Sequence, residues 1–216
     1  MARAVPWFPV VGLIIGTFQG GVYFGASQFT APLLAATLAL GSSLLLTGAF
    51  HHDGLADIAD AFGGGWTVEE RLVILKDSRL GTYGVAALGT ALLIEVAALS
   101  QLDPVDGLRA LLVAHSLGRA SALVTMLFAP TAGDGMGASY IARLSAPAVA
   151  LGVGFGVAVA VLASPTFWPL ALSAAAISSA AVTALAIRKI NGVNGDVLGA
   201  ITVVASLAIL VVSSTA

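Results

Sequence analysis

Three aspartates in one short stretch, Asp53, Asp57 and Asp60, are the residues of this chain best suited to chemistry. Their spacing of i, i+4 and i+7 places the carboxylates within roughly 60° of one another on one face of an α-helix. Carboxylates stacked in this way repel each other, and a cation between them offsets that repulsion. Oxygen ligands in a chain without cysteine indicate a hard ion, Mg²⁺ or Ca²⁺, rather than zinc. The stretch therefore predicts a divalent-metal site, with a solvated interfacial helix face as the alternative.

The composition is that of an integral membrane protein. The 216 residues are 58% hydrophobic, with a mean hydropathy of +1.01, and only 9% are charged. A soluble domain has about 25% charged residues. The absence of cysteine excludes disulfide bonds, thiolate nucleophiles and cysteine-ligated zinc. Nothing in the chain resembles a basic nucleic-acid-binding patch, so we expect no nucleic-acid partner.

Apolar runs divide the chain into membrane-crossing segments. The length of these runs predicts a polytopic, all-α helix bundle with about seven transmembrane helices. A helical cytoplasmic loop at 51–82 interrupts them, and the whole chain, 1–216, is expected to form one membrane-embedded catalytic domain. A cleaved signal peptide is the less favoured interpretation of the first run. The predicted spans lie near 7–24, 31–50, 83–101, 107–128, 145–163, 167–187 and 196–213.

The basic residues predict the orientation of the chain. With these spans, all but one of the loop and terminal bases fall on one side of the membrane, and the other side receives only Arg109. The positive-inside rule then places the N-terminus and the carboxylate stretch in the cytoplasm and the C-terminus outside. We therefore expect a multi-pass protein of a bacterial or archaeal cytoplasmic (inner) membrane. The bases on the shared side are Arg3, Arg71, Lys76, Arg79, Arg143, Arg188 and Lys189.

Local signals organise the segment between the second and third spans. The second run ends at Phe50, which places Asp53 at the membrane–water boundary. The three glycines of 63–65 end the helix that carries the aspartates. Thr67 and Glu70 form a capping-box pattern that predicts a short amphipathic helix over 68–77.

Two later places can complement the carboxylates at the same cytoplasmic mouth. Arg119 follows His115 by one helical turn in the fourth run, and an intramembrane arginine requires a partner or a water-filled cavity. The last loop brings Lys189, Asn194 and Asp196 to the start of the final helix. Asp196 is expected either to join the site or to cap that helix. His115, like Glu95 in the third run, is equally interpreted as a satisfied buried polar group.

The remaining polar residues of the first block have two interpretations each. Asp77 either ligates metal or pairs with Lys76 or Arg79. Lys76, Arg79 and Lys189 either contact phosphate or only set the topology. His51 and His52 are interfacial packing groups, supports for the metal ligands or phosphate contacts. Clustered carboxylates with Mg²⁺ beside lysine and arginine suit phosphotransfer from a diphosphate-linked substrate.

Four segments resemble the cobalamin synthase family, whose activity is adenosylcobinamide-GDP ribazoletransferase. The strongest is HHDGLADIAD at 51–60, and ILKDSRLGTYG at 74–84 is similar to a second block of that family. FPVVGLIIG at 8–16 resembles its opening and GDVLGA at 195–200 its C-terminal motif, so the resemblance covers nearly the whole chain. The chain departs from the pattern at 129–137, which lacks an arginine expected near its start, and at Asn194, where the family tends to have threonine.

The resemblance implies a late step of cobalamin assembly. A ribose hydroxyl of α-ribazole or its 5′-phosphate attacks the cobinamide-side phosphorus of adenosylcobinamide-GDP, and GMP leaves. The implied Mg²⁺ ligands are Asp53, Asp57, Asp60, Asp77 and Asp196, with catalytic roles for Asp57, Asp60 and Asp77 and with Asp60 as the proton acceptor. The implied substrate and phosphate contacts are Lys76, Arg79, Arg119, Lys189, His51, His52 and Asn194. The partners are these small molecules and the lipid bilayer, and a homo-oligomer is compatible with the sequence.

Two other functions remain open from the residues alone. The Asp-Gly-x-x-Asp core is similar to that of CDP-alcohol phosphotransferases, although the rest of their motif is missing. A transporter is the alternative outside enzymes, because Glu95, His115 and Arg119 can line a path through the bundle. The concentration of charge in a cytoplasmic loop and the absence of an internal repeat argue against transport.

Overall fold

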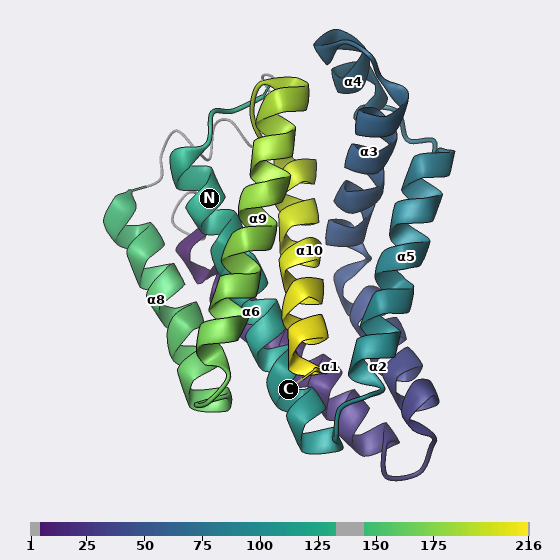
Figure 1. Cartoon of the computed structure of the whole chain (residues 1–216), viewed down its shortest axis with the longest axis vertical. Coiled ribbons are helices and arrows are strands. Elements are labelled where there is room, and N and C mark those ends of the chain that lie inside the picture. The colour runs from purple at the N-terminus through teal and green to yellow at the C-terminus, as the bar shows by residue number, and fades with distance from the viewer. Residues whose placement is uncertain (1–4, 133–144, 216) are drawn as a thin grey trace.

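Apolar runs of this length become helices because a backbone in lipid must satisfy its own hydrogen bonds. The structure is a computed structural model that describes residues 5–132 and 145–215 (Figure 1). Within these residues, six helices are long and apolar enough to cross a membrane, and the number rises to seven if the bent pair of α2 and α3 is counted as one span. The predicted all-α membrane bundle is therefore confirmed. The elements are η1 (Val5–Trp7), α1 (Phe8–Ala26), α2 (Pro32–Thr47), α3 (Phe50–Gly64), α4 (Val68–Ile74), α5 (Thr82–Leu99), α6 (Pro104–Phe128), α8 (Ala146–Ala163), α9 (Trp168–Ile190) and α10 (Gly195–Ser213).

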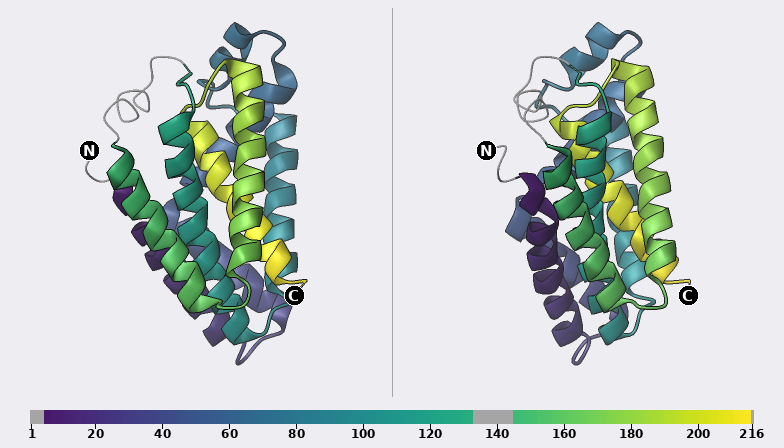
Figure 2. Two further views of the ribbon diagram at one scale, coloured as in Figure 1. Left: turned by 60° about the vertical axis from the view of Figure 1, so that its left-hand side comes forward. Right: turned by 90° about the vertical axis from the view of Figure 1, so that its left-hand side faces the viewer.

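The helices alternate in direction, so the chain connections gather at two opposite ends of the bundle (Figures 1 and 2). The α1–α2, α5–α6 and α8–α9 connections share one end with the C-terminus, which we call the C-terminal end. The other end, which we call the α4 end, holds α4 and the α9–α10 turn. Arg71 and the Arg188–Lys189 pair lie in the last turns of α4 and α9 at the α4 end, whereas Arg109 lies near the start of α6 at the C-terminal end. This separation of the bases matches the predicted alternation, and Arg3 and Arg143 lie outside the described residues.

The second pass is broken, and here the structure corrects the sequence analysis. The apolar run does not continue straight to Phe50. Instead, α2 ends at Thr47 and α3 starts at a 90° angle to it. Gly48 (φ 61°) and Ala49 (φ 56°) both take left-handed conformations, which redirect the chain. Glycine adopts this conformation without cost, whereas alanine does not. As a result, α3 packs along α5 and α10, and Asp53 lies beside α10 rather than beyond the end of a straight span.

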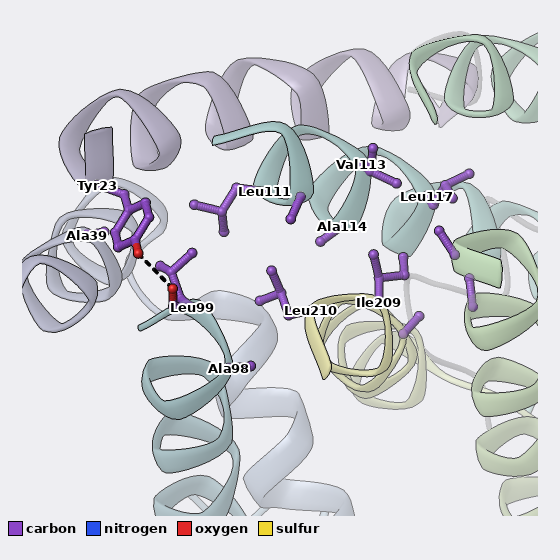
Figure 3. Packing of buried hydrophobic residues seen from close by; sticks show 14 of the residues in the cluster. Tyr23, Ala39, Ala98, Leu99, Leu111, Val113, Ala114, Leu117, Ile209 and Leu210 are labelled. Atoms are coloured by element: carbon purple, nitrogen blue, oxygen red, sulfur yellow. Dashed lines mark hydrogen bonds between the residues drawn. The ribbon is translucent and has the colours of Figure 1, made fainter. Parts of the chain in front are cut away.

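The C-terminal half of the bundle has an apolar core (Figure 3). Tyr23 from α1 is almost fully buried there, and its hydroxyl donates to the carbonyl oxygens of Leu99 and Leu102, both at 2.7 Å. Gly107 of α6 packs so closely on the Tyr23 ring that a methyl group in its place would collide with the ring. Small residues of this kind let membrane helices approach each other. We call this cluster the Tyr23 core, and its labelled members include Leu99, Leu111, Ala114, Ile209 and Leu210 (Figure 3).

The connection from α3 to α5 follows its local signals. Gly65 is the C-cap of α3, and Thr67 and Glu70 form the predicted capping box at the start of α4. The helix is shorter than the predicted 68–77, because it ends at Ile74. Arg71 then anchors the segment by donating to three carbonyl oxygens: those of Gly65, Trp66 and Lys189. Through Lys189, Arg71 also ties the α3–α4 connection to the end of α9.

Candidate functional site

The three aspartates of the first motif lie on one helix, α3, as predicted. Asp57 is half-buried and within electrostatic reach of Asp53 and Asp60 on its own helix. A fourth carboxylate, that of Asp196 in the first turn of α10, lies within the same reach. The four side chains thus form an acidic group at the α4 end, which we call the carboxylate group.

The fourth carboxylate is close because α3 and α10 touch at Gly54. A β-carbon at Gly54 would lie 2.8 Å from the main-chain oxygen of Asp196 and 3.0 Å from its Cα, so only glycine permits this contact without a shift. Asn194 is the N-cap of α10: its Oδ1 accepts from the amide of Val197, and its Nδ2 donates to Oδ2 of Asp196 at 2.9 Å. Asn194 therefore orients Asp196, and the residue that caps the final helix is Asn194 rather than Asp196.

Asp60 turns toward the start of α5. Its Oδ2 accepts from the amide of Gly81 at 2.7 Å, and its Oδ1 accepts from the amide of Gly84 at 2.8 Å. These amides belong to the helix N-terminus, where backbone donors lack partners within the helix and favour a negative charge. A side chain at Gly84 would collide with the Asp60 carboxylate. Asp60 thus joins α3 to α5, a role that the sequence did not indicate.

The carboxylates do not form a ready-made cage in the described ranges 5–132 and 145–215. No three histidine, aspartate or glutamate side chains there are arranged so that they could hold a metal ion as they stand. Asp60 is held by α5, and the Asp53 side chain is exposed. The donor chemistry nevertheless suits a hard cation, because Asp53, Asp57 and Asp196 offer only oxygen atoms.

Asp77 pairs with Arg79 in the α4–α5 connection. Its Oδ2 lies 2.5 Å from Nη2 of Arg79, and the Arg79 side chain is 87% exposed. The side chain and the backbone N–H of Arg79 both donate to the Asp77 carboxylate, which lowers the pKa of Asp77 to about 2. Of the two interpretations of Asp77, the structure therefore adopts the ion pair. Lys76 is exposed one residue away.

Lys189 contributes to the end of α3. Its ammonium group donates to the main-chain oxygen of Phe62 at 3.2 Å, and its own carbonyl accepts from Arg71 at 2.9 Å. A cation at a helix C-terminus satisfies carbonyls that have no partner within the helix. The sequence indicates Arg71 only as one of the topology-setting bases, although its place just after the glycine stop is a signal that it can anchor the loop.

A chain of hydrogen-bonded polar side chains, buried except for the half-buried His115, runs from α5 through α1 to α6. Nε2 of Gln19 donates to Oε1 of Glu95 at 2.7 Å, and Oε1 of Gln19 lies 2.6 Å from Nε2 of His115. Nη1 of Arg119 lies 3.2 Å from Nδ1 of His115 and donates to the His115 carbonyl oxygen. The sequence pointed to His115, Arg119 and Glu95 but not to Gln19, because a glutamine in an apolar run is not by itself distinctive.

This polar chain borders a small interior cavity, which we call the Arg119 cavity. Its volume is about 30 Å³, and α3 contributes His51 and His52, the two residues next to Asp53. Five helices supply the lining, and all of its residues except Val203 have polar side chains. The lining residues are Ser43, Thr47, His51, His52, Glu95, His115, Arg119, Thr202, Val203 and Ser206.

A larger cavity of about 460 Å³ lies between α6, α8 and α9. Its walls are apolar except for hydroxyl groups such as those of Thr125 and Thr183, and no charged residue lines it. It therefore offers nothing that can move a phosphoryl group, and the chemistry belongs to the carboxylate side of the bundle.

The first residues of the 129–137 block form backbone hydrogen bonds with the loop between α9 and α10. The Val193 amide donates to the Pro130 carbonyl oxygen at 2.8 Å, and the Ala132 amide donates to the Val193 carbonyl oxygen at 2.9 Å. This pairing fixes the end of α6 beside the turn that leads to Asp196. Residues 133–137 of the block lie outside the described residues.

Comparison with known proteins identifies relatives along the entire chain. The family model described as cobalamin-5-phosphate synthase matches residues 1–214. The adenosylcobinamide-GDP ribazoletransferase of Mesorhizobium japonicum is 37% identical over 230 residues, which cover 100% of this chain and 84% of that protein. The proteins of the same name from Bradyrhizobium diazoefficiens and Ralstonia pickettii are 39% and 37% identical, over 99% and 91% of this chain and 84% and 78% of their own lengths.

No solved structure matches the chain significantly. The family match spans every segment that brings the carboxylates together: α3, the start of α5 and the start of α10. The chain therefore belongs to the cobalamin-5-phosphate synthase family.

Proposed function

We propose that this protein is an adenosylcobinamide-GDP ribazoletransferase, which joins adenosylcobinamide-GDP to α-ribazole or its 5′-phosphate and releases GMP. Relatives of that name align with nearly the whole chain. The observation that carries the proposal is the contact of α3 with α10, which unites the aspartates of the first motif with Asp196 of the last motif. A diphosphate substrate needs such an acidic, metal-binding group beside the reacting phosphorus.

Asp53, Asp57 and Asp196 are the residues that would hold Mg²⁺. When bound, the ion neutralises the diphosphate and stabilises the leaving phosphate. Asp60 is a weaker candidate for proton acceptor than the sequence suggested, because each of its oxygens already accepts a backbone N–H. We assign the proton acceptor to Asp57 and assign Asp60 to positioning, since it fixes α5 against α3.

The transfer itself exchanges one P–O bond for another. The ribose hydroxyl oxygen bonds to the cobinamide-side phosphorus, and its proton passes to the Asp57 carboxylate. The bond from that phosphorus to the bridging oxygen breaks, and GMP leaves with that oxygen. Lys76 and Arg79 are exposed on the α4–α5 connection, and in this proposal they contact the diphosphate from the mouth of the site. Arg79 is available for this role once it leaves Asp77.

The α4 end is the cytoplasmic end in this proposal. Arg71, Lys76, Arg79, Arg188 and Lys189 lie there, and the positive-inside rule assigns such an end to the cytoplasm. The C-terminus then lies outside a bacterial or archaeal inner membrane. Both small-molecule substrates are thus met on the cytoplasmic side. Transport is not supported, because the Tyr23 core closes the interior below the Arg119 cavity.

The direct test is GMP release by the purified full chain in liposomes, supplied with adenosylcobinamide-GDP and α-ribazole 5′-phosphate. We expect release with Mg²⁺ and none with EDTA. The Asp57→Asn variant should lose release by about 10³-fold, because a charged ligand and the proton acceptor disappear together. Asp106→Asn, which removes a carboxylate at the opposite end, is the matched control and should match the wild type. Release that is indifferent to EDTA, or equal in both variants, would reject the proposal.

A further inference from the structure

The start of α3 is a helix N-terminus inside the bundle. The amides of Phe50, His51 and His52 have no hydrogen-bond acceptor in the described part of the chain, and the first amide of this region that is bonded is that of Asp53. Unpaired N–H groups and the helix dipole make such an end attractive to anions. Broken helices in membrane proteins place these ends against polar cavities. Here the neighbouring cavity is the Arg119 cavity, because Thr47, His51 and His52 all line it.

Arg119 faces the same cavity with unused donors. Its side chain is only 5% exposed, and none of the described carboxylates lies within ion-pair distance of it. Nη1 is occupied by His115, whereas Nε and Nη2 have no acceptor among the described residues. A buried guanidinium group in this state requires an anion or water. It is a second feature, on another helix, that attracts negative charge to the start of α3.

The remaining lining leaves the donors for an anion to Arg119 and the start of α3. Thr47 on α2 and Thr202 and Ser206 on α10 also border the cavity, but their hydroxyl groups donate to the carbonyl oxygens of Ser43, Leu198 and Ala114. Glu95 is the one acid among the lining residues, and it accepts a hydrogen bond from Gln19. Arginine and free backbone N–H groups are usual ligands of phosphate oxygens, and this cavity offers both.

The size and position of the cavity restrict which phosphate fits. A volume of about 30 Å³ holds two or three water molecules at about 10–15 Å³ each, so the cavity has room for a small polar group but not for a nucleoside. Toward the C-terminal end, four of the five lining helices, α2, α5, α6 and α10, continue into the Tyr23 core, the last three through Leu99, Leu111 and Leu210 (Figure 3). The cavity is therefore closed at that end. A diphosphate with large groups on both sides cannot enter it, whereas a terminal phosphate can.

The distance along α3 connects this cavity to the reacting groups. His52 precedes Asp57 by five residues, which corresponds to about 7.5 Å along a helix axis. That is comparable to the length of one ribose phosphate. A terminal phosphate at the start of α3 would hold the ribose of its nucleotide beside the carboxylate group, where the attacking hydroxyl is needed.

We propose that Arg119 and the N-terminus of α3 bind the 5′-phosphate of the nucleotide acceptor, so that this cavity selects α-ribazole 5′-phosphate over α-ribazole. The proposal rests on the proposed function. It makes Arg119 an acceptor-binding residue, separate from the contacts to the diphosphate. The leaving GMP and the corrinoid stay at the mouth, outside the cavity.

The test compares kcat/KM for α-ribazole 5′-phosphate and for α-ribazole in the full chain. The wild type should prefer the phosphorylated acceptor, and Arg119→Gln should lower that preference by about 10–100-fold, the value of a hydrogen-bonded charge pair. The change should come from the phosphorylated acceptor alone, with α-ribazole used as well as before. Arg109→Gln, on the same helix but at the opposite end of the bundle, is the matched control and should keep the wild-type preference.

Other outcomes overturn the proposal. An equal loss for both acceptors would mean that Arg119 contacts the other substrate or supports the fold. To separate these, Glu95→Gln should keep or increase the preference, because it removes a negative charge from the cavity. If Arg119 only balanced Glu95, Glu95→Gln would be as harmful as Arg119→Gln, and the double variant would recover.

A binding measurement keeps the two proposals distinguishable. α-Ribazole 5′-phosphate should raise the melting temperature of the wild type but not of Arg119→Gln, whether or not turnover occurs. A wild type that binds and discriminates but never releases GMP would reject the proposed function alone. A wild type that treats both acceptors alike would reject the phosphate site.

Discussion

The two halves of the bundle share several helices but differ in what they bury. At the α4 end, α3, α5 and α10 bring together the carboxylate group and the Arg119 cavity. At the C-terminal end, the same α5 and α10 join α1 and α6 around the Tyr23 core. Single helices contribute to both regions. α5 carries Glu95, which lines the Arg119 cavity, and Leu99, which belongs to the Tyr23 core; α6 likewise carries Arg119 and Leu111.

This contrast assigns function and stability to different places. Buried charges are costly to a membrane bundle, and natural chains retain them where they bind or react. Closely packed apolar groups contribute stability without chemistry. Substitutions at the α4 end should therefore change activity more than stability, and those in the Tyr23 core should do the reverse.

The largest effect is expected at Asp196. Asp196→Asn should reduce GMP release by about 10²–10³-fold, because it removes one charged ligand while the amide keeps the shape of the side chain. Unfolding in a detergent titration should be unchanged or slightly less favourable, since one carboxylate fewer repels the others. Asp103→Asn at the opposite end is the control. A variant that lost activity and stability in parallel would erase the contrast between the two halves.

The reverse behaviour is expected at Leu111, which is 0% exposed in the Tyr23 core. Leu111→Ala should lower the free energy of unfolding by about 2–4 kcal/mol, since it leaves a cavity in packed surroundings. GMP release per folded molecule should stay within a factor of two of the wild type, by the roughly additive behaviour of distant sites. Loss of activity in protein that remains folded would show that the core also shapes the site.

A smaller, mixed effect is expected at Gly54, where the two helices of the carboxylate group touch. Gly54→Ala forces α3 and α10 apart, and overpacking of this kind costs about 1–3 kcal/mol. Because the shift separates Asp57 from Asp196, GMP release should also fall, with a higher Mg²⁺ requirement. Gly89→Ala on α5, where nothing lies within 4 Å of the added methyl group, is the matched control. An unchanged Mg²⁺ requirement would mean that the two carboxylates act independently.

Much of this arrangement could be predicted from local sequence. The i, i+4, i+7 spacing of the aspartates, the glycine stop and the Thr67–Glu70 capping box all depend on neighbouring residues, and each appears in the structure. The lengths of the apolar runs likewise predicted about seven spans, and the described residues contain six candidate spans, or seven with the bent pair of α2 and α3. These features depend on local geometry, which the sequence shows directly.

The rest depends on contacts between distant segments. Nothing about Ala49 indicates a left-handed residue, so the break between α2 and α3 was not foreseen. Asp60 turned to Gly81 and Gly84 because the start of α5 lies beside it in space. Gln19 acquires its importance only from Glu95 and His115 on other helices.

The central claim, that α3 carboxylates bind the catalytic metal, has a direct test in metal rescue. The chain has no cysteine, so Asp57→Cys introduces one unambiguous soft ligand. We expect this variant to be nearly inactive with Mg²⁺ and to regain GMP release with Cd²⁺, because thiolates favour soft metals. Its ratio of activity with Cd²⁺ to activity with Mg²⁺ should exceed that of the wild type by at least about tenfold. An Asp57→Cys variant whose ratio equals that of the wild type would contradict the claim.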